Sequence, residues 1–471
     1  MATVMHSFLS LMLNPLAPYL AEGRSRYRRP PAVPHGFEPA PLVFTGLDAA
    51  PVVGVVSRLW HMVNDPVGLA CAAAERTNGP FTLRIPGKFD LTYLGSGAHG
   101  YETLMKLPAD HAAIGEVLGN VPNLSLFGFP RSGASDDYDK LQDLAITGKK
   151  ILARMLTPDR IKGLPPMITS VMRERMQHWG DTVDLAEHLY QAVFEISIRY
   201  FGSDEVFERY GEQLIPVLRD IADAIDIPRA ALATTPARFL MREYRATKQL
   251  VRILRRAHRE IPNAPLFAAI RAANVAEADQ LWIAMFVLWN ACTYPGSFAL
   301  WAFVDLVSDP KTLAALNDTD DRLALISCGV FETIRLYPIA SLVRYLREPL
   351  EFEHAGHRYM LPAGTVAGVS PWLLNRDPEV WDDPDQYRPE RFSGVTRPRL
   401  FGAGPFACVA GEFSRVLIAG VCDAILTAND VQLRGPLPRR RCRVHLTYPS
   451  GPVVATVRSR TSTTDTVAIG A

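Results

Sequence analysis

A window of 24 residues without a charged side chain, LWIAMFVLWNACTYPGSFALWAFV, runs from Leu281 to Val304. Its length and apolar character would suit a helix that crosses a membrane. Its centre, however, reads NACTYPGS, and polar groups and a broken backbone are costly at the middle of a lone span. We therefore predict the central buried helix of a large soluble fold, whose polar middle faces a functional site.

Composition limits the classes of partner. The chain of 471 residues has 50 basic and 49 acidic side chains and a net charge of +1, so no overall field attracts nucleic acid. Its six cysteines are scattered and form no CxxC pair. This cysteine usage indicates a reducing compartment, so we expect a cytoplasmic location. We also expect a monomer, and one that does not bind nucleic acid.

The N-terminal segment allows two interpretations. An apolar run, MHSFLSLMLNPLAPYL, is followed by four arginines and by RPPAVP. It lacks a basic n-region and an obvious cleavage site, which argues against a cleaved signal peptide. Residues 1–30 either lie on a membrane surface as a peripheral contact or pack on the body as a helix. We expect one domain over residues 31–460 and a disordered tail over 461–471.

Periodicity predicts mainly α structure with small β-sheets, an α+β class. FTLRIPGKFDLTYL alternates on both sides of Pro86-Gly87 and predicts a hairpin, and helical periods dominate from there to about residue 335. SLVRYLREPLEFEHAGHRYMLPAGTVAGV predicts a small sheet. We expect a helix over Glu412–Thr427 and a last hairpin in VHLTYPSGPVVATV.

Two motifs point to functions that we do not favour. LGSGAHG contains GxGxxG, but no parallel strand with an acidic end follows about 20 residues later, as a dinucleotide site requires. His354 and His357 have a metal-ligand spacing but span a turn without a third ligand nearby. We therefore do not expect a dinucleotide site at the first motif, and we interpret the second as a solvated turn.

The segment FETIRLYP places Glu332 and Arg335 three residues apart on one helical face. Their neighbours are apolar, which indicates burial, and a buried ion pair needs further hydrogen bonds to offset desolvation. Arg391, in the proline-rich stretch RDPEVWDDPDQYRPERF, is the candidate third member of this structural triad.

FGAGPFACVAGEF, residues 401–413, surrounds Cys408 with three glycines, a proline and three phenylalanines. Such a cysteine is either a buried thiol that only packs or one that is held for chemistry. Taken with Glu332-x-x-Arg335 and Pro389-Glu390-Arg391-Phe392, in this order, the chain resembles the haem-thiolate cytochrome P450 family over nearly its whole length.

The resemblance implies a cytochrome P450 fold with haem b between the long central helix and the helix after the cysteine. It implies that Cys408 is the axial iron ligand, and hence the metal ligand, and that Phe401 shields its sulfur. Gly402 and Gly404 would let the backbone turn tightly and approach the porphyrin. Backbone N–H groups and the helix dipole would keep the thiolate ionised.

The resemblance further implies that Arg344 pairs with a haem propionate, and Lys149 is a second candidate for that role. Phe406 stands where the family commonly has an arginine or histidine, and Ala410 where a glycine is usual. Propionate pairing must therefore come from elsewhere in the chain.

The central helix departs further from the family. Many monooxygenase members have an acid–alcohol pair that relays protons to dioxygen, whereas this chain has Thr293 and Tyr294, with no carboxylate. Pro295 predicts a kink beside the iron. LWNACTYPGSFALW resembles the helix of prostacyclin synthase and of the sterol 7α- and 12α-hydroxylases, which divide between isomerisation and oxygenation.

Three functions remain open. The first is a monooxygenase that takes electrons from a ferredoxin or flavoprotein reductase and inserts an atom of O2 into an apolar small molecule, with Asn290, Thr293 or Tyr294 ordering water for protons. The second is an isomerase, dehydratase or peroxide user that needs no redox partner. The third is a haem-binding protein without turnover. For the first, Arg397, Arg399 and Arg415 are candidates for a basic docking patch.

Overall fold

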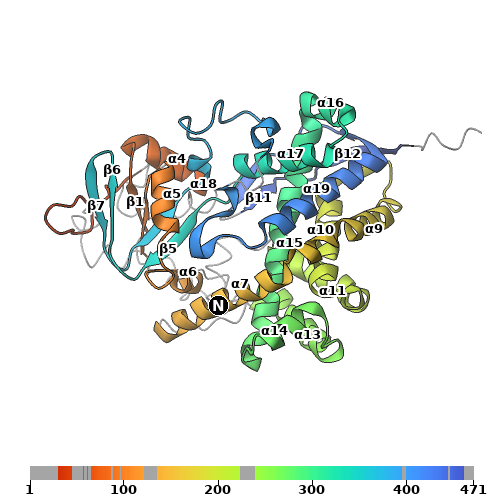
Figure 1. Cartoon of the computed structure of the whole chain (residues 1–471), viewed down its shortest axis with the longest axis horizontal. Helices are drawn as coiled ribbons and strands as arrows, with labels where there is room; N and C mark the ends of the chain where they lie inside the picture. Colours follow the sequence, from red (N-terminus) through yellow and green to blue (C-terminus); the bar gives the residue numbers. More distant parts are fainter. Residues whose placement is uncertain are drawn as a thin grey trace, which may run out of the picture.

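The computed structural model of the chain (Figure 1) describes residues 30–44, 57, 61, 65–85, 89–95, 97–120, 135–222, 239–394, 399–443 and 446–460. The expected tail, and the N-terminal segment up to residue 29, lie outside these residues. The single domain over 31–460 stays a prediction.

Helices form most of the described chain. They are α4 (Pro66–Thr77), α5 (Ala98–Met105), α6 (Gly115–Asn120), α7 (Ser135–Met155), α8 (Pro158–Lys162), α9 (Leu164–Met176), α10 (Leu185–Phe201), α11 (Asp204–Ala222), α13 (Arg242–Glu260), α14 (Pro265–Ala272), α15 (Glu277–Ser308), α16 (Pro310–Asp318), α17 (Arg322–Leu336), α18 (Pro371–Leu374) and α19 (Gly411–Ala428). Short 3-10 turns are η4 (Pro389–Phe392), η5 (Arg399–Phe401) and η6 (Gly404–Phe406).

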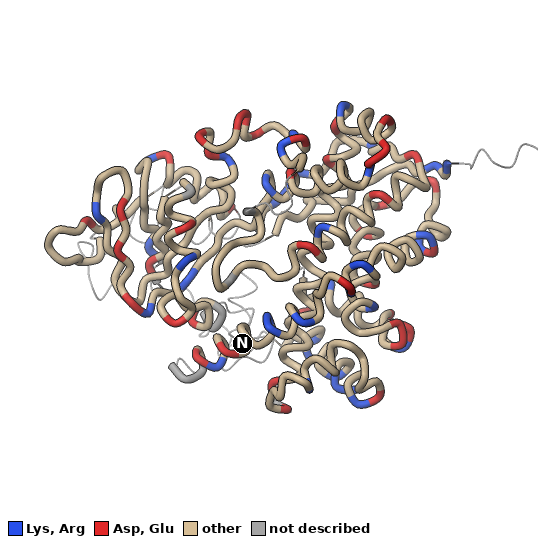
Figure 2. Tube along the Cα trace, in the orientation of Figure 1, with Lys and Arg blue, Asp and Glu red and all other residues tan. Residues whose placement is uncertain are grey.

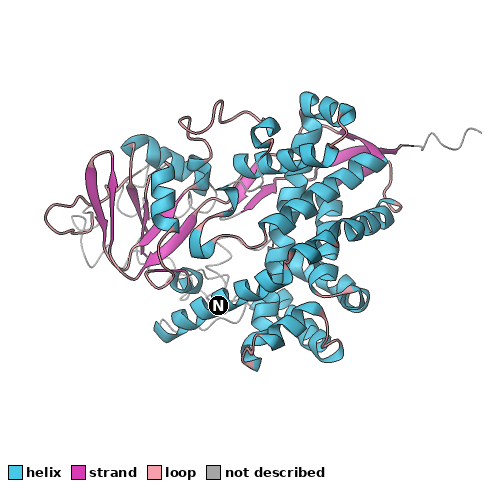
Figure 3. Ribbon diagram, viewed as in Figure 1, coloured by secondary structure: helices cyan, strands magenta, loops and turns pink. Residues whose placement is uncertain are grey.

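The strands form four small sheets. The largest has the order β1 (Phe81–Ile85), β2 (Phe89–Tyr93), β8 (Val366–Val369), β5 (Leu342–Leu346) and β3 (Ala112–Ala113). The other three pair β6 (Leu350–His354) with β7 (His357–Leu361), β10 (Arg440–Arg443) with β11 (Leu446–Pro449), and β12 (Val454–Ser459) with both β4 (Thr182–Asp184) and β9 (Asn429–Leu433). Strands β1, β5, β6 and β7 gather at one end of the molecule and most helices at the other (Figure 3). The expected α+β class is confirmed.

Helix α15 is the predicted central helix and is the only membrane-span candidate among the described residues. Of its most apolar window, 78% is buried inside the protein, which fits a core helix. It contacts α7, α10, α17 and α19, and its residues 280–304 carry no charge. Basic and acidic residues are interspersed over the rest of the described chain (Figure 2). Its acidic first turn, with Glu277 and Asp279, favours helix initiation because carboxylates stabilise the positive N-terminus.

Local predictions succeeded where partners are close in sequence. The hairpin β1–β2 is antiparallel, and α19 covers the expected helix over Glu412–Thr427. The predicted last hairpin is wrong: β11 pairs with β10, whereas β12 pairs with β4 and β9. Alternation identifies strands, but it does not say which strand lies next to which.

Candidate functional site

The cysteine loop closes on itself before α19 begins. The Cys408 N–H donates to the Phe401 carbonyl at 2.8 Å, and the Ala407 N–H donates to the Gly404 carbonyl at 3.1 Å. Gly402 and Gly404 have φ values of +75° and +64°, which L side chains rarely adopt. The tight turn expected from these two glycines is confirmed.

Gly404 also allows a close approach between two segments. A Cβ atom at this position would lie 1.9 Å from the Met105 carbonyl oxygen, at the end of α5. The Phe401 ring lies against Gly411, where a Cβ would be 3.2 Å from it, and near the Phe331 ring at 6.3 Å between centroids. The loop is therefore packed on α5, α17 and the start of α19.

The Cys408 side chain is accessible to solvent, yet surrounding protein raises its pKa by desolvation. The Ala410 N–H and the Lys149 ammonium act in the opposite direction, because both favour a thiolate. A thiol that is accessible and also desolvated lies on the wall of a recess. The sulfur is thus accessible although protein surrounds it, and one backbone donor, the Ala410 N–H, is already in place.

Two cations approach the same space. Lys149, on α7, donates from Nζ to the Pro405 carbonyl of the cysteine loop. Burial lowers its pKa, the Cys408 charge raises it, and Arg344 lowers it again. Arg344, on β5, is only 4% exposed, and burial lowers its pKa to about 10. Two neighbouring, partly desolvated cations form a site suited to an anionic group.

Tyr294, in the polar middle of α15, lies near the cysteine. Burial raises the pKa of the Tyr294 hydroxyl, and the Cys408 charge raises it further, which places the two groups near each other. Thr293 is buried, and its Oγ1 has no hydrogen-bond partner within the described part of the chain. Asn290 instead turns back, with Nδ2 donating to the Phe286 carbonyl at 2.7 Å. Pro295 lies inside α15, which is assigned as a single helix around it.

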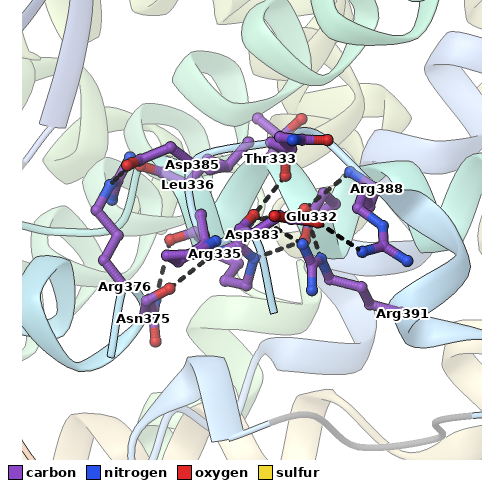
Figure 4. A network of polar contacts seen from close by, with 12 residues as sticks. Glu332, Thr333, Arg335, Leu336, Asn375, Arg376, Asp383, Asp385, Arg388 and Arg391 are labelled. Carbon is purple, nitrogen blue, oxygen red and sulfur yellow. Dashed lines mark hydrogen bonds and ion pairs between the residues drawn. The ribbon is translucent and has the colours of Figure 1, made fainter. Parts of the chain in front are cut away.

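The structural triad is formed and extended by backbone groups (Figure 4). Arg335 Nε and Nη2 donate to the two Glu332 carboxylate oxygens at 2.7 and 2.8 Å, and both side chains are fully buried. Arg391 Nε lies 3.4 Å from Glu332 Oε1, and its Nη2 donates to the Asp383 carbonyl at 2.9 Å. The Arg388 N–H gives Glu332 another donor at 2.9 Å.

Arg335 uses its remaining donors on the proline-rich stretch. Nη1 donates to the Asn375 and Pro384 carbonyls at 2.6 and 2.7 Å, and Nη2 to the Gln386 carbonyl at 3.2 Å. The third partner that burial requires is therefore a set of carbonyls together with Arg391. This network fixes η4, and through it the chain entering the cysteine loop, against α17.

Sequence reasoning missed a second buried cluster. Asp305, at the end of α15, accepts from Thr333 Oγ1 at 2.8 Å and pairs with Arg440 of β10. Burial raises the Asp305 pKa. The guanidinium of Arg440 also stacks on Trp301 and Tyr337, 4.3 and 3.9 Å from their ring centroids. The sequence did offer one signal, because Asp305 is a charged residue that directly follows 24 uncharged ones. Its partner Arg440, however, is 135 residues away.

The two disfavoured motifs have structural roles. Gly100 packs on the Leu94 carbonyl, where a Cβ would lie at 2.6 Å. His357 Nδ1 lies 2.8 Å from Glu38 Oε1, and no group of three His, Cys, Asp or Glu residues in the described ranges could hold a metal ion.

The arginines expected in a docking patch are only partly described. Arg415 pairs with Glu412, and its Nη1 donates to Ser327 Oγ at 2.9 Å, whereas Arg397 lies outside the described residues.

Comparisons with known proteins agree with this geometry. The sequence model of the family described as Cytochrome P450 matches residues 319–442, which include Glu332, Arg335, Arg391 and Cys408. Cytochrome P450 3A27 of Oncorhynchus mykiss is 30% identical over 166 residues, covering 30% of this chain and 31% of the relative. Cytochrome P450 71D18 of Mentha gracilis is 31% identical over 166 residues, covering 30% and 32%. These matches therefore span about a third of the curated relatives' length, and they give no support to the prostacyclin synthase and sterol hydroxylase branch.

Two solved structures share the fold. A 6-coordinated cytochrome P450 from Thermus thermophilus superposes with a TM-score of 0.62 at 21% identity, covering 82% of this chain and 96% of that one. The retinoic acid bound cyanobacterial CYP120A1 gives a TM-score of 0.67 at 17% identity, covering 85% and 96%. The cytochrome P450 fold expected from the sequence is confirmed.

Members of this family bind haem b, a dianionic porphyrin through its two propionates, with a cysteine thiolate as axial ligand. The recess fits such a group, because it combines an accessible thiol with two cations, Lys149 and Arg344. Residues 319–442 thus match the sequence model of the cytochrome P450 family, and the chain as described has the cytochrome P450 fold.

Proposed function

We propose that the protein is a haem-thiolate monooxygenase that inserts one oxygen atom from O2 into an apolar small molecule, using electrons from a ferredoxin or flavoprotein reductase. The observation that carries the proposal is the recess in which Cys408, Lys149, Arg344 and Tyr294 interact electrostatically. Bound haem would supply the oxygen-activating chemistry, and the protein would supply the thiolate, the orientation and the protons.

Cys408 is the proposed axial ligand. The Ala410 N–H donates to its sulfur and favours the thiolate, and α19 begins at the next residue, so the positive end of that helix lies close to the charge. Lys149 adds a positive charge while it holds the Pro405 carbonyl. These contacts would keep the sulfur negative and the loop rigid while iron is bound.

Arg344 and Lys149 are the proposed partners of the two propionates. Their supporting feature is that Arg344 lowers the pKa of Lys149, as expected of two cations in one desolvated space. An anionic group between them would relieve both that repulsion and the cost of burial. This pair takes over the role that Phe406 cannot fill.

Thr293 and Tyr294 are the proposed proton-handling groups. The Thr293 hydroxyl is buried without a hydrogen-bond partner among the described residues, so it is available to hold a water molecule at the recess. Asn290 is a weaker candidate than the sequence indicated, because its Nδ2 donates to the Phe286 carbonyl of its own helix. Pro295 would act only through the backbone of this turn.

A second function needs a test because α15 has no carboxylate between Asp279 and Asp305. Activation of O2 requires protons, and no acid beside Thr293 is available to relay them. A substrate that carries its own O–O or N–O bond would need fewer protons from the protein. We infer a haem-thiolate isomerase, dehydratase or peroxide user as the alternative. Turnover with a peroxide or endoperoxide but not with a reductase would favour this alternative.

We further propose a cytoplasmic monomer. A peripheral membrane contact through residues 1–30 is part of this proposal, and residues 1–29 lie outside the described structure. Sedimentation with anionic vesicles of full-length and residue-30-onward proteins tests it, and equal partitioning of both would count against it.

The deciding experiment is the carbon monoxide difference spectrum of dithionite-reduced protein. Wild type should give a strongly red-shifted Soret band that Cys408→Ser abolishes, while the matched control Cys328→Ser keeps it. Cys328 lies on α17 and is half-buried. Loss of the band in both variants, or its absence in haem-replete wild type, would refute the ligand assignment.

A further inference from the structure

The proline in α15 leaves one backbone carbonyl without its usual donor. In an α-helix the N–H of residue 295 would bond to the carbonyl of residue 291, but proline has no N–H and its ring pushes that carbonyl outward. Ala291 is 9% exposed. A buried carbonyl must find another donor, because leaving it unpaired costs free energy.

Ser197 of α10 provides that donor. Its Oγ donates to the Ala291 carbonyl at 2.9 Å, and Ser197 is fully buried. The two helices approach closely here, because a Cβ on Gly296 would lie only 2.7 Å from the Tyr190 ring of α10. The hydroxyl therefore occupies a defined position beside the proline turn.

The turn that follows Pro295 is fixed from another element. Ser297 Oγ and Trp301 Nε1 both donate to the Thr447 carbonyl of β11, at 2.7 and 2.8 Å. Helix α15 is thus held before the proline by α10 and after it by β11. Thr293 and Tyr294 lie between these two attachments.

We propose that Ser197 is a positioning residue of the haem site: its hydroxyl replaces the helical donor that Pro295 lacks, and so fixes the turn that presents Thr293 and Tyr294. The inference rests on the proposed function for its link to haem, but not for its link to Pro295. It assigns a role in the site to a residue of α10 that no motif indicates.

A double-mutant cycle in the holoprotein tests the link to Pro295. Wild type, Ser197→Ala, Pro295→Ala and the double variant are compared by urea unfolding. Ser197→Ala should lower the folding equilibrium constant about tenfold in the wild-type background, because a buried carbonyl loses its donor. In the Pro295→Ala background the new N–H can reach Ala291, so the same change should cost less than about twofold.

Two matched variants sharpen the cycle. Ser297→Ala removes a buried serine from α15, the helix that contains Pro295, but the Thr447 carbonyl keeps Trp301 as donor, so this variant should cost less than Ser197→Ala. Cys292, whose thiol also contacts Ser197, is the other side-chain neighbour, and Cys292→Ala should leave the cost of Ser197→Ala unchanged. Equal costs of Ser197→Ala in both proline backgrounds would overturn the inference.

Imidazole binding to the holoprotein tests the positioning role. The dissociation constant of imidazole is measured from the shift of the Soret band. Ser197→Ala should weaken imidazole binding about fivefold or more, and Pro295→Ala should largely suppress that effect. A coupled stability cycle with an unchanged imidazole constant would overturn the positioning role and leave the monooxygenase proposal intact. Absence of the thiolate band in wild type would overturn the proposed function, whereas the unfolding cycle would still report on Ser197.

Discussion

Gly404 and Gly394 share a left-handed backbone but have different surroundings. Their φ values are +64° and +74°, and a Cβ on Gly394 would meet nothing within 4 Å, whereas one on Gly404 would lie 1.9 Å from the Met105 oxygen. We expect Gly394→Ala to cost about 1–2 kcal/mol of stability from backbone strain alone. Gly404→Ala should cost more and reduce the carbon monoxide band at the thiolate position, measured at equal haem content. Similar spectra for both variants would contradict a role for the α5 contact.

Arg344 should affect haem retention and apoprotein stability in opposite directions. Because its folded pKa of about 10 lies below the ordinary value of 12.5, the folded apoprotein holds the charge less well than the unfolded chain does. Apoprotein stability should therefore rise as pH increases through 10. Arg344→Ala should leave apoprotein stability unchanged or higher, yet speed haem loss about tenfold, because a charge-assisted contact is gone.

Haem transfer to apomyoglobin measures that rate. Arg358→Ala, an exposed arginine on β7, is the control and should have no effect. Slower or equal haem loss from Arg344→Ala would count against its pairing with a propionate.

Side-chain identity could be predicted at this scale better than side-chain surroundings. The Glu332–Arg335 pair could be predicted from its spacing on one helical face and its apolar neighbours. Cys408 was singled out by the resemblance of its loop to a known family, and its ligand role stays a prediction. The use of the Asn290 amide by its own helix and the contact of Lys149 with Pro405 depend on rotamers and loop geometry. Neither is encoded in a local pattern.

At the level of elements, the Arg335 network joins α17 to the proline-rich stretch. Arg335→Lys would keep the charge but replace a planar group that makes five hydrogen bonds with a single ammonium. We expect a loss of about 3–5 kcal/mol, as for other broken buried pairs. Urea unfolding followed by tryptophan fluorescence is a suitable measurement, since Trp381 lies 5.1 Å from the guanidinium.

Arg388→Lys is the matched control. Arg388 is partly exposed and pairs with Glu390 and Asp383 at the surface, so Arg388→Lys should cost far less stability than Arg335→Lys. Equal costs for the two variants would mean that the network contributes no more than a surface pair.

The elements themselves could be predicted where one period extends over many residues, as in α15 and α19. Their partners could not. The carbonyls of Pro384 and Gln386 reach Arg335 only because the intervening chain folds back, and Ser197 meets Ala291 across 94 residues. Such contacts depend on the packing of segments that are far apart in the sequence, and this packing cannot be predicted from one sequence alone.

At the scale of the whole molecule, strand β12 connects distant parts of the chain, because it pairs with both β4 and β9. Ala455 is fully buried and pairs with Val183 of β4 and Leu433 of β9. Ala455→Asp would bury an unpaired charge between both neighbours, and we expect loss of soluble, haem-binding protein. Ser459→Asp, exposed at the end of the same strand, should behave like wild type in an expression and haem-content assay. Normal expression of Ala455→Asp would show that the three-stranded sheet is dispensable.

The pairing of β4 with β12 also sets an order of events during synthesis. The Val453 N–H bonds to Asp184, 269 residues earlier, so α10 starts beside a strand whose partner is translated much later. A nascent chain therefore carries β4 without its partner strand until β12 has been synthesised. This pairing can form only after most of the helices have been translated, and we expect chains stalled before residue 454 to be captured by chaperones.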